Sequence, residues 1–69
     1  MLVTKDQLVA IGEMLAKIKP DKYGRGWQTA LAKELGVSDR AMRYYVAGDR
    51  NIPKPTARLI QRIAADAMA

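Results

Sequence analysis

Side chains suited to binding anions and planar ring edges are concentrated in one stretch of the sequence, LGVSDRAMRYYVAGDRNIP, from Leu35 to Pro53. Arg40, Arg43 and Tyr44 are its most informative members. Arginine presents a planar fork of N–H donors that matches phosphate oxygens and the O6 and N7 atoms of guanine. A tyrosine can lay its ring on an apolar group or bond a phosphate with its hydroxyl. These residues could bind a polyanion if one surface presents them together.

A helix over residues 39–47 would sort this stretch into two faces, because about 3.6 residues make one turn. The faces differ in polarity: Asp39, Arg40, Arg43, Tyr44 and Ala47 lie on one, and Ala41, Met42 and Tyr45 lie on the other. Tyr45 is therefore predicted to pack in the core, and Tyr44 to be exposed beside the two arginines. By themselves, such arginines are more often solvated surface residues, and Asp39 is favoured by the helix dipole alone.

The first helix is predicted to begin at a capping box formed by Thr4 and Gln7. An apolar stripe follows at three- and four-residue steps, comprising Leu8, Ile11, Leu15 and Ile18. Pro20 ends this helix, because the residue before a proline avoids the helical region. Gly12 is a poor helix former in mid-helix, and the close crossing of another helix would explain it.

Residues 20–26 are predicted to form a loop rich in turn formers. Further helices are predicted over residues 27–35, 39–47 and 56–67. Gly36 and Gly48 end the second and third helices, and Ser38 caps the start of the third. The expected fold is one all-α domain over residues 1–69, a small bundle of four to five helices.

The 69-residue chain contains neither cysteine nor histidine. The usual zinc sites, the usual general base and the Ser-His-Asp triad are therefore excluded, and no enzyme activity, metal or cofactor is expected. No apolar run approaches the roughly 20 residues of a membrane span and no signal peptide is visible, so a cytoplasmic protein without a membrane partner is expected.

The net charge is +5, and residues 17–62 carry eleven Lys and Arg against four Asp and Glu. This local excess favours a polyanionic partner.

The spacing between the second and third predicted helices fits a helix-turn-helix at about residues 28–48. Ala32 is small where the two helices must touch, and Gly36 suits the positive φ of the turn. Apolar residues fill the wedge between the helices, namely Leu31, Leu35, Val37, Met42 and Tyr45. In this motif the exposed face of the second helix enters the major groove, so the polar face of residues 39–47 is predicted to contact double-stranded DNA.

The string QTALAKELGVSDRAMRYYVAGD resembles the lambda-repressor-like (Cro/C1-type) DNA-binding domains, over about residues 28–63. The shorter string LGVSDRAMRYY is similar to the phage regulators called anti-CRISPR-associated repressors. The resemblance implies an autorepressor that binds an inverted repeat in the promoter of its own operon. It also implies contacts to DNA from Gln28, Ser38, Asp39, Arg40, Arg43 and Tyr44, and phosphate contacts from the loop after Gly48. The loop between the first two helices is longer and more basic than in a minimal repressor. No separate ligand domain is recognised, so no small-molecule effector is expected.

Two sets of DNA-contacting residues are predicted. The base-reading set is Ser38, Asp39, Arg40, Arg43 and Tyr44. The phosphate-contacting set flanks it and comprises Arg25, Gln28, Thr29, Arg50, Asn51 and Lys54. Asp39 could accept a hydrogen bond from cytosine N4 or orient Arg43 four residues later. Trp27 shares a face with Leu31 and Leu35, so it is predicted to be a core residue rather than a stacking platform.

A symmetric homodimer is expected, because a domain of this size has a thin core and one helix reads few base pairs. Its interface is predicted on the last helix, at Leu59, Ile63, Ala67 and Met68. Leu2, Val3, Val9 and Met14 form a second apolar group near the first helix.

The alternative function is an antitoxin-like or adaptor protein that acts mainly through a protein partner. A large exposed apolar patch, with Arg40 and Arg43 held in intramolecular ion pairs, would favour that alternative. A nonspecific architectural protein would instead need an arginine arm or apolar wedges for the minor groove, and the chain has no such arm.

Overall fold

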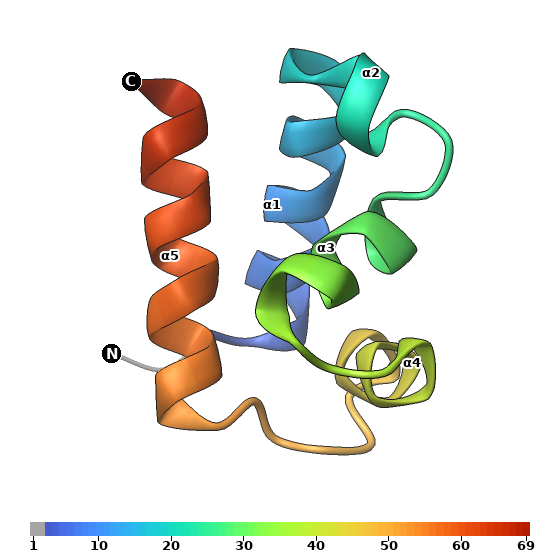
Figure 1. The fold of residues 1–69 in the computed structure, drawn as a ribbon. Coiled ribbons are helices and arrows are strands. Elements are labelled where there is room, and N and C mark those ends of the chain that lie inside the picture. The colour runs from blue at the N-terminus through green and yellow to red at the C-terminus, as the bar shows by residue number, and fades with distance from the viewer. Residues whose placement is uncertain (1–2) are drawn as a thin grey trace.

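Residues 3–69 are described by the computed structural model of the protein, and they form five helices (Figure 1). In chain order these are α1 (Lys5–Ile18), α2 (Pro20–Tyr23), α3 (Trp27–Leu35), α4 (Asp39–Ala47) and α5 (Lys54–Met68). No strand occurs in this part of the chain, so the predicted small all-α bundle is confirmed. None of these helices is both long and apolar enough to span a bilayer. Leu2, one of the predicted apolar group near the first helix, lies outside the described residues.

The start of α1 is fixed by the predicted capping box. Thr4 Oγ1 accepts a hydrogen bond from the Gln7 backbone N–H at 3.2 Å, and Gln7 Oε1 accepts one from the Thr4 N–H at 3.0 Å. Two backbone donors that the helix leaves without partners are thus satisfied reciprocally. The helix ends at Ile18, as the position of Pro20 predicts.

The segment predicted as a loop over residues 20–26 is helical in its first part, which corrects the prediction. Pro20 occupies the start of α2, where its fixed φ suits a helix and its missing N–H costs nothing. The N–H of Gly24 bonds the Pro20 carbonyl at 2.9 Å and closes this single turn. One turn is too short to show a 3.6-residue period, so the sequence gives no periodic signal for it. In the same way, α5 begins at Lys54 rather than at residue 56, because Pro55 fits its first turn.

The core is organised around α1, which contacts each of the four other helices. The largest fully buried side chains come from four helices, and they are Leu8, Leu15, Leu31, Met42 and Ile60. Ile18, predicted as the last member of the apolar stripe of α1, is 46% exposed, because α1 ends there, beyond the buried middle of the bundle.

Gly12 lies in the middle of α1 under the side chain of Trp27. A Cβ atom on this glycine would lie 2.2 Å from the ring atoms Cδ2 and Cε3 of Trp27. The close approach predicted at this glycine therefore exists, but an indole ring makes it rather than a second helix backbone. Trp27 is half-buried and packs against the core, as its position on α3 predicts.

The turn between α3 and α4 sets the orientation of α4. Gly36 has a φ of 73°, in the left-handed region that glycine adopts without strain. The next residue, Val37, donates its backbone N–H to the carbonyl of Ala32 at 3.0 Å. Ala32 is 1% exposed, so a larger side chain would not fit where the two helices meet. In Figure 1, α4 is seen nearly along its axis whereas α5 stands upright, so α4 crosses the long helices steeply.

Candidate nucleic-acid interface

The faces of α4 have the polarity that its sequence predicts. Met42 is fully buried and Tyr45 is 8% exposed, whereas Asp39, Arg40 and Arg43 are exposed. Tyr44 is half-buried. The two neighbouring tyrosines therefore differ as predicted: Tyr45 belongs to the core, and Tyr44 lies at the surface with the arginines.

The N-terminal end of α4 is capped by Ser38. Its Oγ accepts a hydrogen bond from the Ala41 backbone N–H at 3.0 Å. Ser38 is exposed, and its hydroxyl still has one hydrogen to donate outward. Capping and contact with a ligand are therefore compatible at this residue.

One part of the polar surface joins the start of α3 to the first half of α4. Gln28 and Thr29 line a depression of about 220 Å³ together with Asp39 and Arg43. No side chain caps the start of α3, so its first backbone amides have no side-chain acceptor. Two of the predicted phosphate-contacting residues and two of the predicted base-reading residues thus share one concave surface.

The charged groups in this depression are not paired with each other. Within residues 3–69, the one ion pair closer than 4.0 Å joins Lys22 to Glu34, so Asp39 does not form one with Arg43. Of the two predicted roles for Asp39, the orientation of Arg43 therefore lacks the required contact. The carboxylate of Asp39 and the guanidinium of Arg43 both remain open to a ligand.

The second part of the polar surface lies on α4 and the chain that follows it. Arg40 Nε donates a hydrogen bond to Tyr44 Oη at 3.2 Å. The guanidinium carbon of Arg50 lies 4.6 Å from the centre of the Tyr44 ring, and that of Arg40 lies 5.9 Å from it. Arg40, Tyr44 and Arg50 are called the arginine–tyrosine cluster below. The sequence predicted that Arg40 and Tyr44 are neighbours but not that Arg50 joins them.

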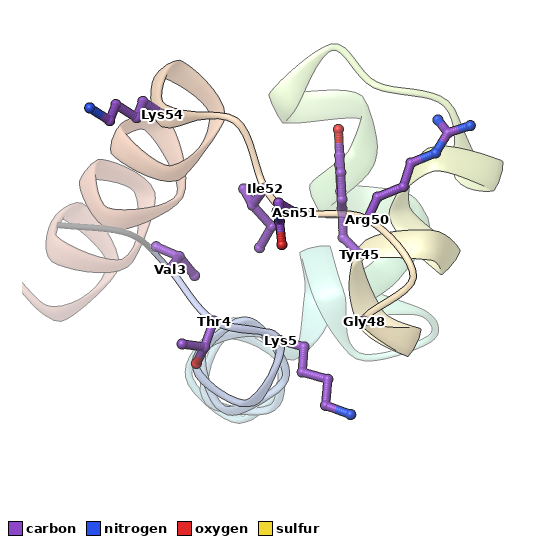
Figure 2. A pocket seen from close by; sticks show the side chains of 9 residues that line it. All are labelled: Val3, Thr4, Lys5, Tyr45, Gly48, Arg50, Asn51, Ile52 and Lys54. Atoms are coloured by element: carbon purple, nitrogen blue, oxygen red, sulfur yellow. The ribbon is translucent and has the colours of Figure 1, made fainter.

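The remaining predicted phosphate-contacting residues are more dispersed. Arg25 is exposed between α2 and α3. Arg50, Asn51 and Lys54 border a depression of about 540 Å³ between the start of α1 and the segment before α5. Figure 2 shows that Ile52 points into this depression, whereas the charged ends of Arg50 and Lys54 point away from it on opposite sides. These two cations therefore do not act as one cluster.

A second polar cluster, formed by Lys22, Tyr23 and Glu34, was not predicted. The Tyr23 ring is only 2% exposed, and its hydroxyl donates a hydrogen bond to Glu34. Lys22 Nζ lies 2.9 Å from Glu34 Oε1, so the cluster contains a paired carboxylate. Tyr23 falls in the segment predicted as a loop, and one helical turn offers no periodicity that would mark it as a core residue.

The pKa values of Tyr23 and Glu34 in this second polar cluster follow from burial and from the neighbouring charges. Burial raises the pKa of the Tyr23 hydroxyl well above its usual value, and the hydrogen bond to Glu34 and the charge of Glu34 raise it further. Burial also raises the pKa of Glu34. The hydrogen bonds from Tyr23 and Lys22, with the charges of Lys22 and Lys19, outweigh that effect and leave the pKa of Glu34 below its usual value. Tyr23 therefore stays protonated and Glu34 stays ionised near neutral pH.

The residues predicted for a dimer interface fall into two groups. Leu59 and Met68 are 37% and 69% exposed. Ile63 and Ala67 are half-buried and pack against the core of their own chain. The C-terminal ends of α1 and α5 lie toward the same end of the molecule (Figure 1). The last residues of these two helices are Ile18 and Met68, and both are exposed.

Comparison of the chain with protein-family models, with curated proteins and with solved structures gave no match.

Proposed function

We propose that this protein is a sequence-specific, double-stranded DNA-binding transcriptional repressor that uses α3, the turn and α4 as a helix-turn-helix. One observation carries the proposal. Arg40 and Arg43 are exposed on α4, and neither forms an ion pair with a carboxylate of residues 3–69. The same face adjoins the uncapped start of α3.

The chemistry of this surface suits a DNA groove. An arginine without a carboxylate partner retains its full set of donors for guanine or for phosphate. Arg43 and Asp39, beside Gln28 and Thr29, combine a donor and an acceptor for base edges with backbone amides for a phosphate. On this proposal Arg40 and Arg43 approach the major groove, Arg25 and Lys54 contribute to the positive field around it, and the Asn51 amide donates a hydrogen bond to a phosphate.

The alternative, an adaptor that works through a protein partner, is less well supported. Intramolecular ion pairs of Arg40 and Arg43 would favour it, and neither arginine forms one within the described residues. A broad exposed apolar surface would also favour it. The exposed large apolar side chains of this part of the chain are Ile18, Leu59 and Met68, three residues on two helices.

The proposal includes a homodimer that binds an inverted repeat and represses its own operon, as the resemblance to phage regulators implies. Such a repressor would act in the cytoplasm of a bacterial cell, and an anti-CRISPR operon is the target that the narrower resemblance implies. Leu59 and Met68 supply exposed apolar surface on α5 for the second copy. Because α5 does not contact α4, a dimer formed through α5 leaves both recognition surfaces free.

Selection of binding sites from a random double-stranded DNA pool tests this function. The purified protein is expected to enrich an inverted repeat whose half-sites lie about 10 bp apart, or a multiple of that spacing. Footprinting of the DNA upstream of its own gene would then locate the operator. The Arg40→Ala and Arg43→Ala variants serve as matched controls. Failure to enrich any sequence, or enrichment that both variants retain fully, would contradict the proposal.

A further inference from the structure

Tyr44 is the shared contact of two arginines that come from different segments. Arg40 precedes it by one helical turn on α4, and Arg50 lies beyond the end of that helix. The hydroxyl accepts the hydrogen bond from Arg40 at 3.2 Å, and the guanidinium of Arg50 lies 4.6 Å from the ring centre. That second distance is within the roughly 6 Å over which a cation is attracted to an aromatic face. The ring and the hydroxyl of Tyr44 thus have separate partners.

The end of α4 brings Arg50 to this ring. Gly48 has a φ of 82°, and the chain turns back there. The Asp49 backbone N–H then bonds the Tyr44 carbonyl at 3.0 Å, which holds the following residue beside the helix. Figure 2 shows the side chain of Arg50 directed away from the depression that Ile52 enters. The position of Arg50 therefore depends on backbone hydrogen bonds as well as on the ring.

No carboxylate of the described residues forms an ion pair with either arginine. Asp49 lines the same shallow surface as Arg40, Arg43 and Tyr44. Its carboxylate oxygens lie more than 4.0 Å from the guanidinium nitrogens of these arginines. Two like charges are therefore gathered around one neutral ring. This arrangement is repulsive in isolation and becomes favourable beside a polyanion.

We infer that Tyr44 is a positioning residue, which holds Arg40 and Arg50 as a pair for DNA and does not itself read a base. This inference rests on the proposed DNA-binding function. Arg40 is aligned through the hydroxyl and Arg50 through the ring face. Because both arginines are ordered before DNA arrives, less side-chain entropy is lost when they bind. Arg50 then adds to the DNA contacts of α4 although it lies outside the helix, rather than acting as an isolated loop cation.

The variant Tyr44→Phe separates the two contacts, because it keeps the ring and removes the hydroxyl. Tyr44→Ala removes both. In the free protein, proton NMR of the Arg50 side chain reports the stacking directly, since protons over a ring face resonate upfield. We expect the upfield shift in the wild type and in Tyr44→Phe, and its loss in Tyr44→Ala.

Binding to the selected operator gives the second measurement, as a double-mutant cycle of Tyr44→Ala with Arg50→Ala. The loss of affinity caused by Arg50→Ala is expected to be about 2- to 5-fold smaller in the Tyr44→Ala background than in the wild type, from the usual strength of an exposed cation–π contact. In the Tyr44→Phe background, Arg50→Ala should have its full effect. The base preference of the Tyr44→Ala variant should stay that of the wild type at every operator position except those where Arg40→Ala also changes it.

The possible failures are distinguishable. A wild-type protein that enriches no DNA sequence overturns the proposed function and, with it, this role of Tyr44. If the wild type binds its operator but the losses from Tyr44→Ala and Arg50→Ala multiply independently, the inference alone is wrong. The same holds if Tyr44→Ala relaxes the preference at a base pair where Arg40→Ala leaves the preference unchanged, which would make Tyr44 a base-reading residue.

Discussion

Two tyrosines in this small protein hold polar clusters of opposite character. Tyr23 lies between Lys22 and Glu34, in a cluster where the cation and the carboxylate neutralise each other. Tyr44 lies between Arg40 and Arg50, and no carboxylate of the described residues pairs with either. The first cluster joins α2 to α3 and covers a buried ring. The second leaves uncompensated positive charge at the surface.

The comparison shows that the local balance of charge, more than residue type, separates a structural cluster from a candidate binding surface. Both clusters contain a tyrosine, and both place a cation near its ring. Where a carboxylate completes the set, the charges are satisfied within the chain and the cluster stabilises the fold. Where it is missing, electrostatic energy is gained only when an external anion approaches.

The largest expected effect distinguishes the two rings by stability. Tyr23→Ala should lower the free energy of unfolding by about 3–5 kcal/mol, because it removes a buried aromatic ring and leaves a cavity. Tyr44→Ala should lower it by about 1 kcal/mol or less, because this ring is only half-buried and surface substitutions cost little. Urea unfolding followed by circular dichroism measures both. Equal losses would show that the two clusters do not differ as described.

Removing one positive charge from the surface beside the arginine–tyrosine cluster, and one from the Tyr23 cluster, tests the comparison through DNA binding. Arg43→Ala should weaken specific binding by about 1–3 kcal/mol, the value of a bidentate base contact. Lys22→Ala removes the same charge from the neutralised cluster, and it should leave the preferred sequence unchanged. Titration of the operator and of a scrambled duplex with each variant gives both affinities. A Lys22→Ala variant that loses specificity as fully as Arg43→Ala would contradict the assignment.

Acid should weaken the Tyr23 cluster through Glu34. Its pKa is lowered in the folded protein, so its contribution to stability is complete above the unfolded pKa of about 4.3 and is lost as the pH falls through the folded value. Glu34→Gln keeps an oxygen acceptor for Tyr23 but removes the charge that pairs with Lys22, so it should cost about 1 kcal/mol or less near neutral pH, the usual value of an exposed ion pair, and less at acidic pH. Thermal unfolding of both proteins from pH 7 to pH 3 measures this difference. A constant difference across that range would exclude Glu34 as the titrating group.

The smallest expected effect concerns Lys54, which points away from Arg50. Lys54→Ala should weaken binding to all DNA sequences about equally and reduce the slope of log affinity against log salt concentration by about one unit. Fluorescence anisotropy at several salt concentrations provides the slope. Selective loss of operator binding would instead place Lys54 at a base.

Much of the fold was predictable because its helix ends are marked by local chemistry. The Thr4 capping box, the Ser38 cap and the two positive-φ glycines define helix ends to within a residue, and each depends on neighbours in the sequence. The alternation along residues 39–47 likewise separated Tyr45 from Tyr44, because a helix of nine residues shows its period clearly.

The parts that were missed depend on contacts between segments. Neither the contact of Tyr23 with Glu34, eleven residues apart, nor the stacking of Arg50 on Tyr44 leaves a periodic signal. The exposure of Ile18 has the same origin. The apolar stripe of α1 continues to the end of that helix, but the neighbouring helices do not cover its last residue, Ile18. Local pattern fixes which face of a helix is apolar, whereas the position of the next segment decides how much of that face is buried.

The indole ring of Trp27 over Gly12 gives the molecule an internal optical reporter. The chain contains one tryptophan, so all of its indole emission comes from the contact between α1 and α3. That contact is at the N-terminal end of α3, whereas the turn into α4 follows its C-terminal end, and it involves none of the arginines of the polar surface. The colour and intensity of this emission therefore record whether α1 and α3 remain packed together, and, because Trp27 directly precedes Gln28 and Thr29, they also respond to a ligand bound at the start of α3.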